Sequence, residues 1–166
     1  MLILVGLVVG YFGLIIFLCR RFPEEHWQQG ERPTLKRSAF DKDFLWGIAT
    51  AAFQIEGGDQ SSNWAHWEKQ TDEAGNSRIL TGEQAGLACN HRALYVEDLL
   101  RAKEFGFNSY RFSICWGRVQ QSPDSTFDFS FYDALIDKAL ELNLKPVITL
   151  HHFSHPQWFD ELGGFL

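Results

Sequence analysis

Residues 107–114 read Phe-Asn-Ser-Tyr-Arg-Phe-Ser-Ile, a short apolar run with one arginine, Arg111, inside it. Two similar runs occur at residues 44–54, which end in Gln54, and at residues 145–152, which end in His152. In parallel α/β folds, polar side chains that handle ligands gather at the carboxyl ends of successive strands, where the open loops are. The pattern therefore predicts that Gln54, Arg111 and His152 converge on one pocket.

The segments around these runs have helical periodicity. Residues 88–105 carry apolar side chains at helical spacing, and Gly106 is placed to end this helix in a left-handed cap. Residues 131–143 repeat the pattern with one apolar stripe, formed by Tyr132, Leu135, Ile136, Ala139 and Leu140. The apolar run at residues 147–150 is typical of a parallel strand buried on both faces. The alternation predicts an α/β fold with a right-handed βαβ unit, as in the wall of a β/α barrel.

Three motifs in this part of the chain resemble one known family. They are residues 44–57 (Phe-Leu-Trp-Gly-Ile-Ala-Thr-Ala-Ala-Phe-Gln-Ile-Glu-Gly), residues 110–118 (Tyr-Arg-Phe-Ser-Ile-Cys-Trp-Gly-Arg) and residues 149–153 (Thr-Leu-His-His-Phe). In this order, they resemble the amino-terminal third of glycoside hydrolase family 1, the β-glucosidase family, from about Phe40 to Leu166. The resemblance implies a partial (β/α)8 TIM barrel with about its first three βα units.

The resemblance also implies roles for the three polar residues. The family's matching glutamine binds two adjacent hydroxyls of the glycone, and the amide of Gln54 offers the donor and the acceptor that this requires. His151 and His152 must point to opposite sides of a strand, and the family match selects His152 as the second sugar ligand. Arg111 matches an arginine that orients the nucleophilic glutamate. The alternatives are a core glutamine, structural histidines and an ordinary structural salt bridge.

The family reaction is retaining hydrolysis of a β-glycoside by two glutamates, one in an Asn-Glu-Pro motif and one later in the barrel. Neither motif occurs in the chain. We therefore expect a fragment without catalytic residues of its own, which is inactive alone, with a β-glycoside as ligand and a separate carboxyl-terminal barrel fragment as a partner. The alternatives are a non-catalytic sugar-binding or interaction protein and a truncated gene product without independent function.

Several residues depart from the family pattern. Phe153 stands where a tryptophan is usual, and further departures occur at Asn90, Arg92, Ser154 and Phe165. The loss of an indole donor at Phe153 removes one contact to the sugar. The identity of the glycone therefore cannot be inherited from the family.

Residues 1–19 contain no charged side chain and are followed by Arg20 and Arg21. Their number is close to the ~20 residues that span a bilayer. The pattern predicts a single transmembrane anchor at residues 1–21 that contacts the lipid bilayer, then a linker at residues 22–39 and the barrel part at residues 40–166. The basic residues after the span place the body on the cytoplasmic side. A secretory signal peptide is the alternative, although a basic amino-terminal region and a clear cleavage site are lacking.

The composition excludes other classes of function. The net charge is −6, and no basic patch lies outside the flank of the apolar segment, so nucleic-acid binding is not expected. The three cysteines, Cys19, Cys89 and Cys115, are widely spaced and match neither a metal site nor a disulfide framework. We expect no metal and no cofactor.

Overall fold

The computed structural model describes residues 2–22 and 39–165, and the chain divides into two compact units, residues 1–42 and 43–166. The helix of the first unit is α1 (Leu2–Arg21), with Arg20 and Arg21 in its last turn. Residues 23–38, most of the predicted linker, lie outside the described residues.

The predicted membrane anchor is not supported. Within residues 2–22 and 39–165, no helix is long and apolar enough to cross a membrane. The prediction of a single-pass anchor at residues 1–21, and with it the predicted membrane localisation, is therefore wrong, and the cytoplasmic placement of the body loses its basis.

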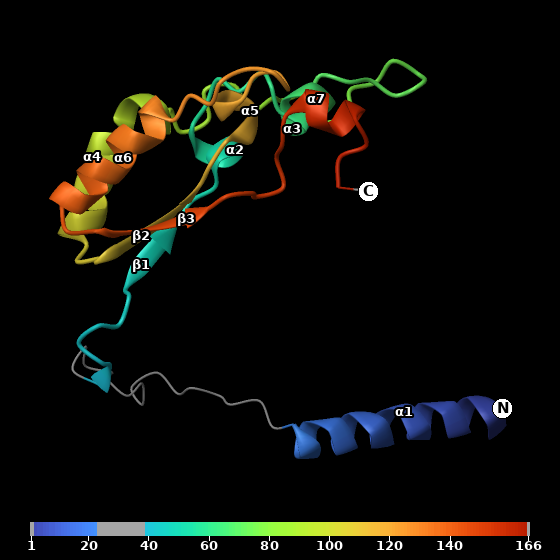
Figure 1. The fold of residues 1–166 in the computed structure, drawn as a ribbon. Coiled ribbons are helices and arrows are strands. Elements are labelled where there is room, and N and C mark those ends of the chain that lie inside the picture. The colour runs from blue at the N-terminus through green and yellow to red at the C-terminus, as the bar shows by residue number, and fades with distance from the viewer. Residues whose placement is uncertain (1, 23–38, 166) are drawn as a thin grey trace. The chain divides into compact units, whose positions relative to one another are not determined.

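The second unit is built on a parallel sheet of three strands (Figure 1). The strands are β1 (Gly47–Ala49), β2 (Ser109–Ser113) and β3 (Lys145–Thr149), in the order β1-β2-β3. Arg111 in the middle of β2 pairs with Ala49 on one side and with Val147 on the other. The predicted parallel arrangement is confirmed, and its carboxyl ends meet at one edge of the sheet.

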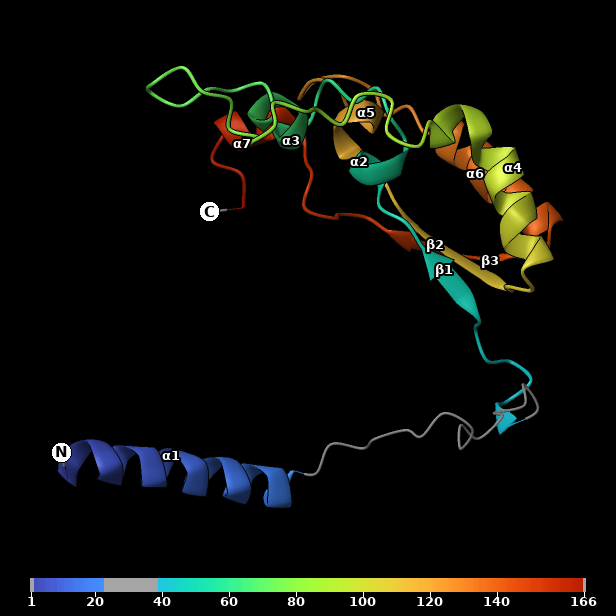
Figure 2. The same ribbon diagram turned by 180° about the vertical axis from the view of Figure 1, so that it is seen from behind.

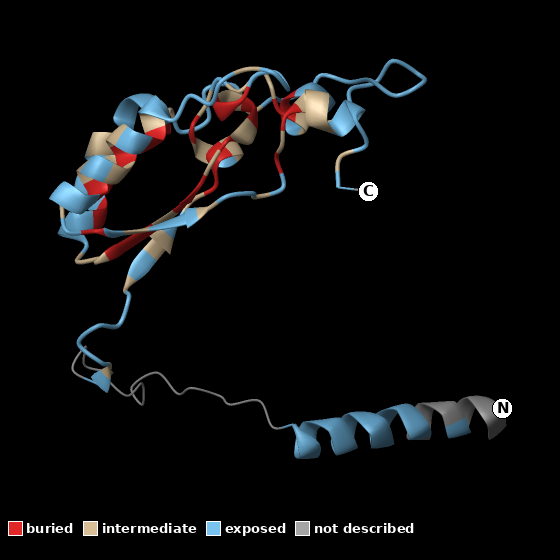
Figure 3. Cartoon of the chain, in the orientation of Figure 1, coloured by how far each residue is buried: buried red, intermediate tan, exposed pale blue. Residues whose placement is uncertain are grey.

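Two long helices, α4 (His91–Glu104) and α6 (Ser130–Glu141), lie side by side on one face of the sheet (Figures 1 and 2). Each begins within three residues of its predicted start. The turn after α4 passes through Gly106 with φ 82°, the left-handed conformation expected there. These helices and β2 enclose the core, drawn in red in Figure 3. It contains Leu99, Ala102, Tyr110, Phe112, Tyr132, Leu135, Ala139 and Leu144.

Burial is the main source of stability of this unit. Leu99 and Leu135 are each only 1% exposed, and burying one such side chain contributes about 1.5–3 kcal/mol. β3 departs from the prediction, because Val147 and Ile148, which point to opposite faces of the strand, are 39% and 42% exposed. A parallel barrel strand is covered on both faces only when neighbouring strands and the layers inside the barrel are present. In the described part of the chain no further strand pairs with β3.

Short helices follow the carboxyl ends of the strands (Figure 1). They are α2 (Ala52–Ile55) and α3 (Asn63–Trp67) after β1, α5 (Trp116–Val119) after β2, and α7 (Gln157–Glu161) after β3. Ser62 caps α3, because its hydroxyl accepts a hydrogen bond from the Ala65 backbone N–H at 3.1 Å. An antiparallel bridge between Ser62 and Pro156 holds α3 beside the start of α7.

Candidate functional site

A small pocket lies beyond the carboxyl ends of the strands. It has a volume of about 100 Å³, and both Gln54 and His152 line it. The complete lining is Ala51, Phe53, Gln54, Trp64, His152, Phe153 and Ser154. The structure thus brings together two of the three predicted site residues in one concave surface.

Gln54 does not lie at the end of a strand as predicted. The run at residues 44–54 is a strand only over Gly47–Ala49, and Gln54 lies in α2. A helical turn forms here because Ser113 Oγ accepts the free N–H of Ala52 at 2.8 Å, at the start of α2. The side chain of Gln54 is exposed, and its amide has no hydrogen-bond partner among the described residues. Both its donor and its acceptor are therefore available to a ligand.

Arg111 lies next to the pocket and holds His152. Its Nε donates to Thr149 Oγ1 at 2.5 Å, and its Nη2 lies 3.2 Å from His152 Nδ1. A guanidinium has donors only, so Nδ1 of His152 is the acceptor. The neutral imidazole therefore carries its proton on Nε2, where it can be donated to a ligand. The ring of His151 stacks instead on His155, with centroids 5.8 Å apart.

The backbone after His152 is shaped by an unusual conformation. Phe153 has φ 64°, and its side chain is 71% exposed. Its carbonyl oxygen accepts a hydrogen bond from Trp64 Nε1 at 3.1 Å. This bond fixes the indole of Trp64 in the wall of the pocket, 5.8 Å from the ring of Phe53.

A buried charged network beside the pocket was not predicted from the sequence. Glu56 is 4% exposed, and its Oε1 accepts a hydrogen bond from the Tyr132 hydroxyl at 2.8 Å. Its Oε2 forms an ion pair with Arg118 Nε at 3.3 Å, and Arg118 Nη2 donates to the Gly57 carbonyl at 2.7 Å. Desolvation raises the pKa of Glu56 above its ordinary value, although Tyr132 and Arg118 oppose that shift.

This network joins a segment that follows β1 to two segments that follow β2. The Tyr132 hydroxyl also accepts the backbone N–H of Cys115 at 2.6 Å, so that α2, α5 and α6 meet at one carboxylate. Because Glu56 follows Gln54 by two residues, the network sets the position of the turn that presents Gln54. A carboxylate at the end of an apolar run was the signal for it in the sequence, since such a group needs a buried partner.

A second buried network lies on the helix side of the sheet. His91 Nδ1 lies 2.7 Å from Asp98 Oδ2, and His91 Nε2 lies 3.3 Å from the Tyr110 hydroxyl. That hydroxyl is 2.7 Å from Thr50 Oγ1, and burial raises the pKa of Tyr110 to about 12. The chain of contacts ties α4 to β2 and to the end of β1. Over the described residues, no group of three or more His, Cys, Asp or Glu side chains could hold a metal ion.

The pocket has the chemistry of a polyol site. It offers the free amide of Gln54, a fixed imidazole at His152 and the indole of Trp64. An amide and an imidazole N–H can bond two neighbouring hydroxyls, and an aromatic face can pack on the apolar face of a sugar ring. None of the described lining residues is a carboxylate. The described lining therefore supplies hydrogen-bonding and aromatic groups of the kinds that contact hydroxyls and sugar rings.

Known proteins resemble this chain in sequence and in fold. The chain is 38% identical to beta-glucosidase A of Acetivibrio thermocellus over 138 residues, which are 79% of this chain and 30% of that protein. It is 35% identical to the human cytosolic beta-glucosidase, with 77% of this chain and 28% of that protein covered. The structure of a beta-glycosidase from Pyrococcus horikoshii matches with a TM-score of 0.65 and 37% identity, over 76% of this chain and 28% of that one.

A second solved structure gives the same result. The family 1 β-glucosidase of Thermotoga maritima matches with a TM-score of 0.69 and 30% identity, over 75% of this chain and 29% of that one. The chain thus spans less than a third of the length of these relatives. The sequence pattern of the family described as "Glycosyl hydrolase family 1" matches residues 36–166 of the chain. The resemblance found in the sequence motifs is confirmed, and the chain belongs to glycosyl hydrolase family 1.

Proposed function

We propose that this chain forms the amino-terminal wall of the sugar-binding site of a retaining β-glycosidase. In this proposal Gln54 and His152 bind adjacent hydroxyls of the glycone, and the barrel part begins near Phe40, after a linker at residues 22–39. The observation that carries the proposal is that Gln54 and His152 line one pocket while Arg111 holds His152. The names of the relatives, beta-glucosidases and a beta-glycosidase, support the substrate class.

Binding and catalysis are separable in this proposal. A retaining glycosidase uses two carboxyl groups about 5–5.5 Å apart, one as the acid and base and one as the nucleophile. The described lining of the pocket has no carboxylate. The residues of this chain therefore position the ring, and their hydrogen bonds accelerate the reaction to the extent that they strengthen as the ring flattens in the transition state. Arg111 would orient the nucleophilic glutamate through the guanidinium N–H groups that Thr149 and His152 do not use.

Sugar binding is tested first on the full chain. Saturation-transfer NMR with methyl β-D-glucopyranoside should show saturable binding. The change Gln54→Ala or His152→Ala should weaken it about tenfold, which corresponds to the loss of one good hydrogen bond. His151→Ala is the matched control, because the neighbouring imidazole lies against His155 and should leave the affinity unchanged. Equal losses in all three variants would argue against these roles.

Hydrolysis is tested by supplying the remainder of a barrel. The chain is co-expressed with the carboxyl-terminal part of the Acetivibrio thermocellus relative, and turnover of an aryl β-glucoside is measured. We expect turnover by the pair, a loss in the Gln54→Ala pair and none by the chain alone. A second candidate function, sugar binding without hydrolysis, is favoured by the absence of carboxylates from the described lining. A pair that assembles and binds the glucoside without turning it over would support that candidate.

A further inference from the structure

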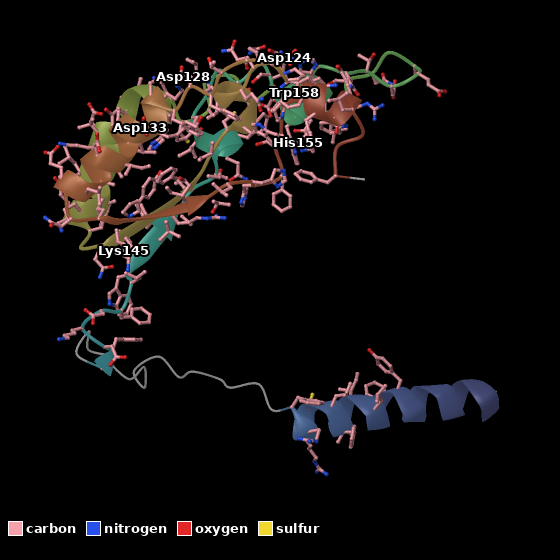
Figure 4. The ribbon with its side chains drawn as sticks, in the orientation of Figure 1. Asp124, Asp128, Asp133, Lys145, His155 and Trp158 are labelled. Atoms are coloured by element: carbon pink, nitrogen blue, oxygen red, sulfur yellow. The ribbon has the colours of Figure 1, made fainter. Side chains whose placement is uncertain are left out.

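A larger cavity lies between α3 and α7, next to the pocket that contains Gln54. It has a volume of about 400 Å³, and Trp64 is the one residue that lines both cavities among those described. Its lining consists of Asn63, Trp64, Trp67, Gln70, Gln157 and Asp160. Figure 4 shows the labelled His155 and Trp158 at this end of the unit, far from Lys145 at the start of β3. The cavity therefore lies among the loops that follow the strands.

Hydrogen bonds hold the frame of this cavity together. Asn63 joins the loop before α7 through two bonds: its Oδ1 accepts the N–H of His155 at 3.0 Å, and its own N–H donates to the His155 carbonyl at 2.9 Å. The indole of Trp64 is fixed by its hydrogen bond to Phe153, and Asp160 Oδ1 lies 3.0 Å from His155 Nε2. A ligand would thus meet a surface that is already formed, which reduces the entropy cost of binding.

The side chains that face the cavity keep unused binding groups. Trp64 and Trp67 are 45% and 41% exposed, although both are large aromatic residues. The indole N–H of Trp67 and the amide of Gln70 have no hydrogen-bond partner in residues 39–165. Asp160 binds His155 through Oδ1, and its other oxygen forms no hydrogen bond or ion pair with the described residues. Aromatic faces and free hydrogen-bonding groups therefore lie side by side.

This combination matches one class of ligand. A pyranose has an apolar face that packs on an indole, and a rim of hydroxyls that both donate and accept. Among the described residues of the lining none is cationic and Asp160 is acidic, which opposes phosphates and other anions. An apolar peptide would bury the amide of Gln70 without a partner.

We propose that the cavity between α3 and α7 is a second saccharide-binding site, which takes a neutral pyranose unit on the faces of Trp64 and Trp67. The site is distinct from the pocket of Gln54 and His152, and the proposal does not depend on their roles. Trp67, Gln70, Gln157 and Asp160 belong to the second site alone.

The test uses the full chain labelled with ¹⁵N and cellobiose as the probe. The six tryptophans give six indole N–H signals at most, and substitution of Trp67 assigns its own signal. We expect the Trp67 signal to shift saturably with cellobiose. Binding measured by calorimetry should weaken about tenfold in Trp67→Ala and be retained in Trp67→Tyr, which keeps an aromatic face. Gln70→Ala, an exposed change that removes only an amide, should weaken binding as well.

Two controls separate this site from its neighbour and from a general effect. Gln54→Ala should leave the Trp67 shift intact, and Phe127→Ala, which removes another exposed aromatic ring outside the cavity, should leave the affinity unchanged. The proposal is overturned if cellobiose at ~50 mM produces no saturable shift of Trp67. It is also overturned if Gln54→Ala abolishes the shift while Trp67→Ala and Gln70→Ala bind as the wild type does.

Discussion

The guanidinium of Arg111 donates a hydrogen bond to Nδ1 of His152 over 3.2 Å, although 41 positions separate the two residues in the sequence. Neighbouring parallel strands bring them together, because Arg111 lies in β2 and His152 follows β3. Since an arginine side chain cannot accept a proton, this contact determines which ring nitrogen of His152 faces a ligand as a donor. A residue of the sheet thus sets the chemistry of a loop residue.

The first prediction concerns the tautomer of His152. In the wild type we expect the neutral ring to carry its proton on Nε2, because Nδ1 accepts from Arg111. In Arg111→Met the donor is lost, and the Nδ1–H form should become populated. Long-range ¹H–¹⁵N correlation spectra report the tautomer directly. A predominant Nδ1–H form in the wild type would contradict the hydrogen bond.

The second prediction concerns the hydroxyl of Tyr132. It donates to Glu56 Oε1 and accepts from the N–H of Cys115, so Tyr132→Phe leaves two buried polar groups without their partner. We expect the free energy of unfolding to fall by about 1–3 kcal/mol. Urea denaturation followed by circular dichroism measures the change. Tyr95→Phe is the matched control, because the ring of Tyr95 packs on Phe131 and the loss should stay within about 0.5 kcal/mol.

The third prediction concerns pH. Desolvation raises the pKa of Glu56 in the folded chain above its ordinary value of 4.5. Between the two values the folded state keeps a proton that the unfolded state releases. The stability contributed by Glu56 is therefore present below about pH 4.5 and is lost as the pH rises through the folded pKa. The variant Glu56→Gln lacks this contribution, because the amide of glutamine does not ionise in this pH range.

The stability of the wild type relative to Glu56→Gln should consequently decrease as the pH is raised from below 4.5 toward neutrality. Urea unfolding of both proteins across this interval provides the difference, in which the contributions of other groups cancel. Glu97→Gln, which removes an exposed carboxylate from α4, is the matched control. A difference that grows with pH would show that the Arg118 ion pair outweighs desolvation.

The fourth prediction compares two adjacent glycines with left-handed backbone. Gly57 has φ 77°, and a Cβ there would lie 2.1 Å from the Leu87 carbonyl oxygen. Gly58 has φ 65° with no atom within 4 Å of such a Cβ. We expect Gly58→Ala to cost about 1–2 kcal/mol, the cost of the conformation alone. Gly57→Ala should cost clearly more, because two backbone segments must separate, and the urea midpoints of the two variants measure this. Equal midpoints would mean that the backbone at Leu87 moves away from residue 57 at no cost in stability.

Local periodicity was sufficient to predict the framework. The spacing of Leu99 and Ala102 on one helix, and of Leu135 and Ala139 on the other, predicted α4 and α6 because one face of each must be apolar to cover a sheet. The parallel direction of the strands was predicted from the alternation of strands with helices. The family resemblance was confirmed by the match over residues 36–166.

Other features depend on contacts that a linear pattern does not contain. Gln54 lies in a helical turn because Ser113, which follows Ala52 by 61 positions, accepts the N–H of Ala52. The partners of Glu56 lie in α5 and α6, so neither could be assigned before the fold was known. The length of the apolar run at residues 1–19 likewise led to a wrong prediction, because no helix in the described part of the chain is long and apolar enough to cross a membrane. The roles of Gln54, Arg111 and His152 in sugar binding stay predictions.

The order β1-β2-β3 also has a consequence for synthesis on the ribosome. β2 pairs with β1, and β3 pairs with β2. Each new strand can therefore pair as soon as it is made, because no later strand has to be inserted between two neighbours. At ~5–20 residues per second, Ser109 is added about 3 to 12 seconds after Gly47, its partner in the register. During that interval β1 has no strand to pair with, and this is the window in which a nascent-chain chaperone would be most useful. Once β2 has emerged, it serves as the template for β3.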